Sequence, residues 1–300
     1  SAASDVYKRQ VLEVSNMGAF LEARLMLTRA MGTERWNKIL LNWGWKKFKK
    51  KSPELAILVQ NNSQFKNIHK GQRCFVVGNG PSLKEQDLSL LQDEYVFTCN
   101  QIMRNPSFPK MKSNYHFFAD PSFFQLKKDN SSDMEVYHLM QKINTDNNRP
   151  KVFFAVEGYD FSKEFKLNKY LDLNFFSHRL ELTEKFDLEF DFSRFVPNLH
   201  SVVMYEIIMA IYMGFSEIYL LGCDCTSIIT AVNMRLHEGE GAEYGYKMTE
   251  NEKERLKKRN SNILMEDELR SFSEVFRAYR IFYEYTKKRG VKLVNCTEGG

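Results

Sequence analysis

A glycine-rich loop is the segment of this sequence with the most evident chemistry. It reads Gly78-Asn79-Gly80-Pro81-Ser82 and follows directly on a short apolar run. A strand that turns through glycines into a helix presents backbone N–H groups and the positive end of a helix dipole, and glycine lets a phosphate approach the main chain. We therefore expect this loop to bind an anionic ligand. A side chain at Gly80 should block that ligand and leave the fold intact.

The loop departs from the two common nucleotide-binding motifs. Leu83 stands where the dinucleotide fingerprint requires its third glycine, and Asn100 stands where that fingerprint has an acidic residue for the ribose. No Gly-Lys-Ser/Thr triplet follows, so a Walker-type ATPase is disfavoured. A tight turn that binds no ligand is the alternative interpretation.

Polar residues follow other predicted strands at the points where those strands end. Asn100 follows the run 95–99, Asp120 follows 115–119, and Gly222 and Asp224 follow 218–221. Ser201 begins the predicted helix 202–212. Each could equally be a helix cap or turn residue. In open α/β sheets, however, ligands bind at the carboxyl ends of the strands, so these residues would line one crevice together with the loop.

The elements that would position these residues alternate between strands and helices. The predicted strands are 74–77, 95–99, 115–119, 152–155, 218–221 and 291–294, and the clearest helices are 202–212 and 272–287. Continuous apolar runs indicate parallel strands that are covered on both faces. We predict an α/β, Rossmann-like fold with a mostly parallel sheet, helices on both faces and a helical segment before it.

The domain boundaries follow from changes in this pattern. We interpret residues 1–10 as an artefactual leader, 11–66 as a helical N-terminal extension and 67–300 as the Rossmann-like domain. The intervals 125–150 and 156–197 are polar, aromatic and aperiodic, so we expect insertions there that lie outside the sheet. The chain stops soon after a predicted strand, which is typical of a fragment.

Composition excludes several classes of protein. A chain of 300 residues that is 43% hydrophobic can bury a large core, and a formal net charge of +5 is too small to indicate nucleic acid as the main partner. Five cysteines without paired spacing predict reduced thiols and a cytoplasmic protein. The segment 43–51 combines two tryptophans with five lysines, which predicts peripheral contact with the inner face of a membrane or only a solvated helix end.

Longer stretches of the sequence resemble a known family. The segments 69–83, with His69-Lys70-Gly71-Gln72-Arg73-Cys74 leading into the loop, 214–224 and 294–300 resemble the MptE-like family, which is named after an archaeal 6-hydroxymethylpterin diphosphokinase. Many bacterial members of that family sit among genes for surface polysaccharides. Gly78-Asn79-Gly80-Pro81-Ser82-Leu83, Cys99-Asn100-Gln101 and Pro121-Ser122-Phe123-Phe124 are also similar to bacterial Cst-type sialyltransferases, which use a CMP-sugar without a metal. The resemblance covers roughly residues 69–300.

The resemblance implies roles for single residues. Gly78, Asn79 and Gly80, with the adjoining Pro81 and Ser82, would contact the nucleotide phosphates. Asn100 and Asp120 would lie near the nucleoside and sugar, Ser201 would meet the phosphate, and Gly222 and Asp224 would lie at the edge of the site. The sialyltransferases place a catalytic histidine before the last helix, where this chain has none between 266 and 272. Asp224, Asp120 and His237 are therefore the candidate catalytic bases.

The resemblance also implies a function. It predicts a nucleotide-donor-dependent transferase, specifically a glycosyltransferase-like enzyme of capsule or lipopolysaccharide biosynthesis, with a CMP-sugar type of donor and a glycan acceptor. The sequence has no Asp-x-Asp triplet, so we expect no metal requirement. A 6-hydroxymethylpterin diphosphokinase that uses ATP and Mg²⁺ is the first alternative. A non-catalytic nucleotide-binding module is the second.

Overall fold

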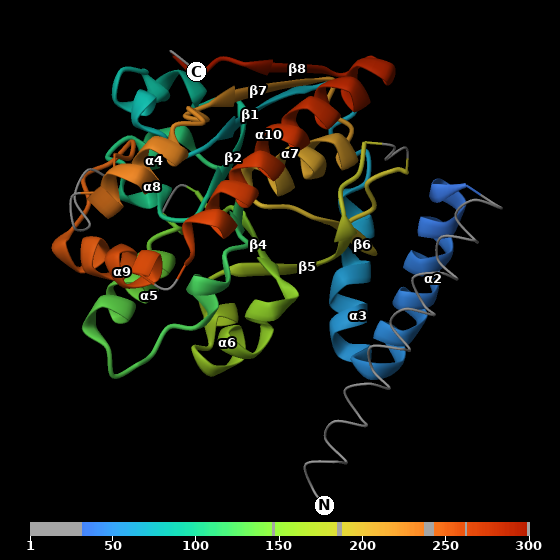
Figure 1. The fold of residues 1–300 in the computed structure, drawn as a ribbon, viewed down its shortest axis with the longest axis horizontal. Helices are drawn as coiled ribbons and strands as arrows, with labels where there is room; N and C mark the ends of the chain where they lie inside the picture. The colour runs from blue at the N-terminus through green and yellow to red at the C-terminus, as the bar shows by residue number, and fades with distance from the viewer. Residues whose placement is uncertain (1–31, 146–147, 185–187, 237–242, 262, 299–300) are drawn as a thin grey trace, which may run out of the picture.

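The fold is built on one sheet of eight strands, all parallel (Figure 1). The computed structural model describes residues 32–145, 148–184, 188–236, 243–261 and 263–298. The strands are β1 (Arg73–Val77), β2 (Tyr95–Cys99), β3 (Tyr115–Phe118), β4 (Lys151–Ala155), β5 (Asp172–Glu181), β6 (Phe195–Asn198), β7 (Glu217–Leu221) and β8 (Lys292–Asn295). The predicted α/β architecture is confirmed.

Helices cover both faces of the sheet. They are α2 (Thr33–Lys51), α3 (Pro53–Gln60), α4 (Phe108–Met111), α5 (Ser131–Gln141), α6 (Tyr159–Glu164), α7 (Val202–Tyr212), α8 (Ser227–Leu236), α9 (Glu250–Ser261) and α10 (Met265–Lys288). Neighbouring strand residues enter different cores because side chains alternate along a strand. Phe117 and Phe153 pack on the side of α7 and α10, whereas Phe118 and Phe154 pack on the side of α5 and α6. The continuous apolar runs of the strands are explained by this double coverage.

The strand order places a switch point in the middle of the sheet. The order is β6-β5-β4-β3-β2-β1-β7-β8, so the chain adds strands outward from β1 to β6 and then returns to the other side of β1. β1 pairs with β7 from Arg73 opposite Glu217 to Val77 opposite Leu221. The connections that leave β1 and β7 therefore diverge at the carboxyl ends of these strands, and ligands bind at such a crevice in open α/β sheets.

The interval 156–197 contains part of the sheet, and the expectation that it lies outside the sheet was wrong. β5 and β6 both fall in it, and they extend the sheet beyond β4. The sequence of β5 interrupts its apolar residues with Asn174, Ser177 and His178, and β6 contains Pro197. Proline is confined to edge strands, and β6 is the edge. Both strands therefore lack the apolar pattern by which the central strands were predicted.

Two helix predictions also need correction. The chain after the glycine loop forms two separate 3₁₀ turns, η2 (Pro81–Lys84) and η3 (Leu88–Leu91), and not the helix into which the loop was expected to lead. Asp87 separates them, because its carboxylate accepts the backbone N–H of Ser89 at 3.1 Å and starts the second turn. The last helix begins at Met265, several residues before the predicted start.

Other expectations about the chain have mixed outcomes. All five cysteines are free thiols, as predicted. The N-terminal extension is helical in α2 and α3, but residues 1–10, which we interpreted as a leader, lie outside the described residues. Within the described part of the chain, no helix has both the length and the apolar content that crossing a bilayer requires.

Glu206 of α7 is a buried carboxyl group among apolar neighbours. It is 0% exposed, and neither carboxyl oxygen has a hydrogen-bond partner among the described residues. Burial raises the pKa of Glu206 well above its usual 4.5. The folded protein therefore keeps this proton at pH values where the unfolded chain has lost it, so stability falls as pH rises above about 4.5.

Replacing Glu206 by methionine is expected to stabilise the protein. Methionine fills a similar volume and removes an unsatisfied polar group, so the free energy of unfolding should rise by about 1–3 kcal/mol near pH 8. The gain should shrink toward about pH 5, where the unfolded carboxyl also holds its proton. Urea denaturation at the two pH values measures both effects. The exposed Glu254 offers the control E254M, and an equal gain at both pH values would contradict the prediction.

Candidate functional site

A cavity of about 750 Å³ lies at the carboxyl ends of the strands. Its walls include most of the residues that the sequence singled out, namely Gly78, Asn79, Gly80, Pro81, Asn100, Asp120, Ser201, Gly222 and Asp224. Ser82 does not line it, and His237 lies outside the described residues. The structure therefore brings these positions together at one sheet edge, while their roles stay predictions.

The backbone amides of the glycine loop are engaged by the protein itself. Gly78 donates its N–H to the carbonyl oxygen of Leu221 at 2.8 Å, and Gly80 donates to that of Gly222 at 2.9 Å. The backbone N–H of Ser82 donates to Asp224 Oδ1 at 2.9 Å. The expectation that these amides are free to bind a phosphate was wrong. They instead attach the end of β1 to the end of β7.

Asp224 joins the two loops at the switch point. Its second carboxylate oxygen, Oδ2, accepts the hydroxyl of Ser82 at 2.9 Å, so both oxygens are bonded to one residue. The other predicted acid, Asp120, accepts the backbone N–H of Ser122 at 2.8 Å. Each carboxylate therefore caps a turn at the rim of the cavity. Neither arrangement resembles a base that is oriented toward a substrate hydroxyl.

Two asparagines of the cavity lining have a side-chain oxygen without a hydrogen-bond partner among the described residues. Asn79 donates its side-chain N–H to the carbonyl oxygen of Cys99 at 3.1 Å, which leaves Asn79 Oδ1 without a partner among the described residues. Asn100 has a left-handed backbone, with φ of 51°, and its Oδ1 is also buried and unpaired. Buried polar atoms without partners are uncommon and costly. Both oxygens therefore lack the donor that such an atom usually has.

The N-terminus of α7 opens into the same cavity. Ser201 precedes the helix in extended conformation, and its side chain makes no capping hydrogen bond. Ser201, Val202 and Val203 all line the cavity. The first N–H groups of a helix have no partner within that helix, and its dipole favours an anion there. With the loop amides occupied, the start of α7 offers free backbone N–H groups to the cavity.

Two histidines with carboxylate partners line the cavity, and sequence reasoning missed both. His200 Nδ1 lies 3.3 Å from the hydroxyl of Ser271 on α10, and His200 Nε2 lies 3.9 Å from Glu181 at the end of β5. His178 Nε2 lies 3.5 Å from Glu157, which follows β4. The partners are distant in sequence, and His178 falls in the interval we took for an insertion. For His200, its position next to Ser201 was the available signal.

The pairing between His178 and Glu157 also affects the carboxylate. Burial would raise the pKa of Glu157, but the hydrogen bond and the charge of His178 lower it overall. Glu157 is therefore ionised at neutral pH. The Glu157 carboxylate can orient the His178 imidazole through Nε2, and Nδ1 takes no part in this pair.

Comparisons with known proteins add a weak similarity. No protein-family model matches the sequence, and no curated protein sequence matches it. Among solved structures, the chain is similar to the sialyltransferase CstII from Campylobacter jejuni in complex with the substrate analogue CMP-3FNeuAc, at 18% identity over 75% of this chain and 80% of that chain, with a TM-score of 0.42. CstII in complex with cytidine-5'-monophosphate is 17% identical over 77% of this chain and 82% of that chain, with a TM-score of 0.40. CST-II in complex with a trisaccharide acceptor and CMP is 16% identical over 75% of this chain and 80% of that chain, also with a TM-score of 0.40.

A likeness of this size transfers no residue role, donor or acceptor to the present chain. The MptE-like resemblance stays a prediction, because no family model supports it. The roles of the site residues therefore rest on their own geometry and chemistry.

A strap formed by residues 243–249 closes one wall of the cavity. Glu243 and Tyr244 line the cavity, and the ring of Tyr244 stacks on that of Tyr246 with centroids 5.4 Å apart. The backbone N–H of Gly245 donates to the carbonyl oxygen of Asn79 at 2.9 Å. The strap is therefore bound to the same glycine loop that ends β1.

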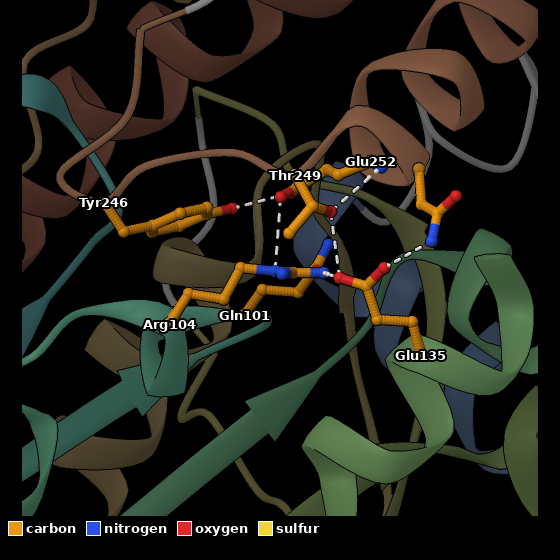
Figure 2. Close-up of polar contacts among 7 residues, drawn as sticks. Gln101, Arg104, Glu135, Tyr246, Thr249 and Glu252 are labelled. Carbon is orange, nitrogen blue, oxygen red and sulfur yellow. Dashed lines mark hydrogen bonds and ion pairs between the residues drawn. The ribbon is translucent and has the colours of Figure 1, made fainter.

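Arg104 ties the strap and α9 to α5 (Figure 2). Its Nη2 lies 2.7 Å from Glu135 Oε1, and its Nε lies 3.2 Å from Glu252 Oε2. Glu135 also accepts the hydroxyl of Thr249 at 2.9 Å, and Glu252 accepts that of Tyr246 at 2.9 Å. Burial raises the pKa of Glu252, and the charge of Arg104 opposes this shift. The buried Arg104 guanidinium thus balances the charge of two carboxylates, Glu135 of α5 and Glu252 of α9.

Replacing Arg104 by methionine is expected to release the strap. The variant leaves Glu135 and Glu252 facing each other without a cation, and loss of one partner in a buried ion pair typically costs 3–5 kcal/mol. Hydrogen exchange of residues 243–252 should increase more than that of the central strands. The control is R73M, which breaks the exposed pair of Arg73 with Glu94 and should cost less than about 1 kcal/mol. Unchanged exchange in the strap of the Arg104 variant would contradict the prediction.

The cavity shows no prearranged metal site in the part of the chain that the structure describes. No group of three or more histidine, cysteine, aspartate or glutamate residues there is placed to hold a metal ion. The residues at hand do not by themselves form a Mg²⁺ site of the kind the diphosphokinase alternative would use.

Proposed function

We propose that this protein is a glycosyltransferase that binds a nucleotide-sugar donor in the cavity and transfers the sugar to an acceptor hydroxyl. The observation that carries the proposal is the cavity itself, about 750 Å³ at the switch point between β1 and β7, with unpaired amide oxygens and a helix N-terminus in its wall. Sites for cofactors and other small molecules typically have about 300–1,000 Å³. The cavity volume lies within this range, and we expect it to accommodate a nucleotide with one sugar.

The donor would bind with its phosphate at the start of α7. Ser201 and the first amides of α7 would hold the phosphate oxygens and stabilise the charge that develops as the sugar leaves. Asn79 and Asn100 lie on the β1 and β2 side of the cavity, and their unpaired oxygens would accept hydrogen bonds from the ribose or base. The glycine loop would contact the donor only through van der Waals packing, because the N–H groups of Gly78, Gly80 and Ser82 are already hydrogen-bonded within the protein.

His200 is the proposed general base. Glu181 lies on the Nε2 side of its ring and favours a proton there, which leaves the Nδ1 lone pair to accept another. The hydroxyl of Ser271, 3.3 Å from Nδ1, occupies the position that an acceptor hydroxyl would take. His200 also precedes Ser201 directly, so the base would lie beside the leaving phosphate. His178, Asp120 and Asp224 are the alternative bases that variants must test.

Ligand screening by thermal shift tests the donor part of the proposal. The protein is heated with CMP, UDP, GDP or ATP, each with and without Mg²⁺. We expect stabilisation by one nucleotide without a metal, with CMP as the first candidate from the sequence resemblance. Stabilisation by ATP only with Mg²⁺ would instead support 6-hydroxymethylpterin diphosphokinase activity. Tight nucleotide binding without turnover of any nucleotide sugar would support a binding module and overturn the transferase proposal.

The cellular role that we propose is capsule or lipopolysaccharide biosynthesis at the cytoplasmic side of the cell. Its support is the sequence resemblance alone. Deleting the gene in its source organism and comparing the surface glycans tests it, because loss or truncation of one glycan is expected. An unchanged glycan profile would leave the enzyme activity standing and remove this role.

A further inference from the structure

One side of α2 is packed against the body of the protein, and the other side is exposed. Trp45 is buried, and its ring meets that of Phe195 of β6 edge-on with centroids 5.1 Å apart. On the outer side, Ile39 is 48% exposed and Trp43 is 59% exposed. Of the two tryptophans that the sequence placed in one basic segment, therefore, only Trp43 is available to a partner.

The exposed side of α2 is also strongly basic. From position 35 to position 51 the chain has no acidic residue and seven basic ones, Arg35, Lys38, Lys46, Lys47, Lys49, Lys50 and Lys51. Lys46, Lys47 and Lys50 are exposed, and none of them forms an ion pair within the described ranges. Lys47 Nζ lies 5.5 Å from the centroid of the Trp43 ring. Apolar and basic groups are thus interleaved on one surface.

The spacing of these residues places them along one helix face. Positions 39, 43, 47 and 50 are separated by four, four and three residues, and such positions lie above one another on an α-helix. Figure 1 shows α2 at the outside of the molecule, beyond β6 and next to α3. We call the surface formed by Ile39, Trp43, Lys46, Lys47 and Lys50 the α2 face.

We propose that the α2 face docks on the surface of an anionic lipid bilayer. Lysines are attracted to anionic headgroups, and an exposed tryptophan is favoured at the boundary between headgroups and acyl chains. The exposed Ile39 and Trp43 favour a bilayer over a soluble polyanion, because a polyanion offers nothing apolar for an isoleucine. This inference does not depend on the proposed enzymatic function.

Flotation of the full chain with lipid vesicles tests the proposal. We expect binding to vesicles that contain phosphatidylglycerol, none to pure phosphatidylcholine, and release at high salt. Changing Lys46, Lys47 and Lys50 together to glutamine should weaken binding roughly 100-fold, since each lysine near the surface contributes about a fivefold gain in affinity. The matched control changes three exposed lysines elsewhere, Lys110, Lys112 and Lys127, to glutamine, and we expect it to bind like the wild type.

Trp43 provides the readout that separates a bilayer from other partners. Its fluorescence should shift to shorter wavelength when anionic vesicles are added, and the shift should be missing in W43F. The variant W43A should weaken vesicle binding and leave any binding to heparin unchanged. Equal vesicle binding by W43A and wild type, or equal loss in the lysine variant and its control, would overturn the proposal. Circular dichroism of each variant checks that the fold is retained.

Discussion

Replacing Gly80 by alanine should prevent stable folding rather than only block a ligand. Its φ of −68° is open to any residue, so the need for glycine is steric. A Cβ atom here would lie 1.6 Å from Asp224 Oδ2 and 2.7 Å from the carbonyl oxygen of Gly222. That oxygen accepts the N–H of Gly80, so the loops must separate and lose the bonds between β1 and β7. We expect a loss of about 4 kcal/mol or more in the free energy of unfolding, measured by urea denaturation.

Two variants make this prediction specific. Gly71 has a positive φ of 80° but no atom within 4 Å of an added Cβ, so G71A should show only backbone strain of about 1 kcal/mol. Adding D224G to G80A removes the closest clash and should restore part of the stability. If G80A were as stable as the wild type and merely bound nucleotide poorly, our original expectation for Gly80 would be right and this one wrong.

Replacing His200 by asparagine should lower kcat by about 10²–10⁴-fold, because general base catalysis typically contributes that much. The affinity for the nucleotide should change little, since in our proposal Ser201 and the first amides of α7 hold the phosphate and the His200 side chain does not. The acidic limb of the pH profile of kcat/KM, which reports ionisation of the base, should flatten as well. Release of nucleotide from the donor found in the thermal shift screen measures the rate.

Other histidine and aspartate variants show whether His200 holds this role. His138 lies exposed on α5, away from the cavity lining, so H138N should retain wild-type activity. H178N should lose less activity than H200N, and D120N and D224N should affect stability more than the pH profile. A larger loss of kcat in H178N, or a pH profile that D224N alone flattens, would move the base to that residue.

The central part of the fold could be predicted because its signals are local. β1 to β4, β7 and β8 are short apolar runs, and α7 is an apolar segment bounded by Ser201 and a glycine turn. Such runs form strands or buried helices wherever both faces are covered, and the residue after each parallel strand must lie at the same sheet edge. The positions of Asn79 and Asn100 around one cavity follow from that rule alone.

The edge strands and the engaged amides could not be predicted in the same way. β5 and β6 carry polar residues, of which His178 and Asn198 line the cavity, so their pattern resembles that of a loop. The amides of the glycine loop are occupied by Leu221, Gly222 and Asp224, which come more than a hundred residues later. The residues around the loop contain no pattern that predicts a hydrogen-bond partner so far away in the sequence.

The sequence by itself determined the type of sheet, the glycine loop and the set of polar residues at its carboxyl edge, because strand and helix formation depend on neighbouring residues. Only the tertiary structure decided which groups at that edge are free to act. It closed the amides of the loop by pairing β1 with β7, left the start of α7 open, and brought His200 to Glu181 and Ser271. Hydrogen bonds between segments that are far apart in the sequence form only where packing of the helices and strands brings their atoms together. That packing depends on the whole chain.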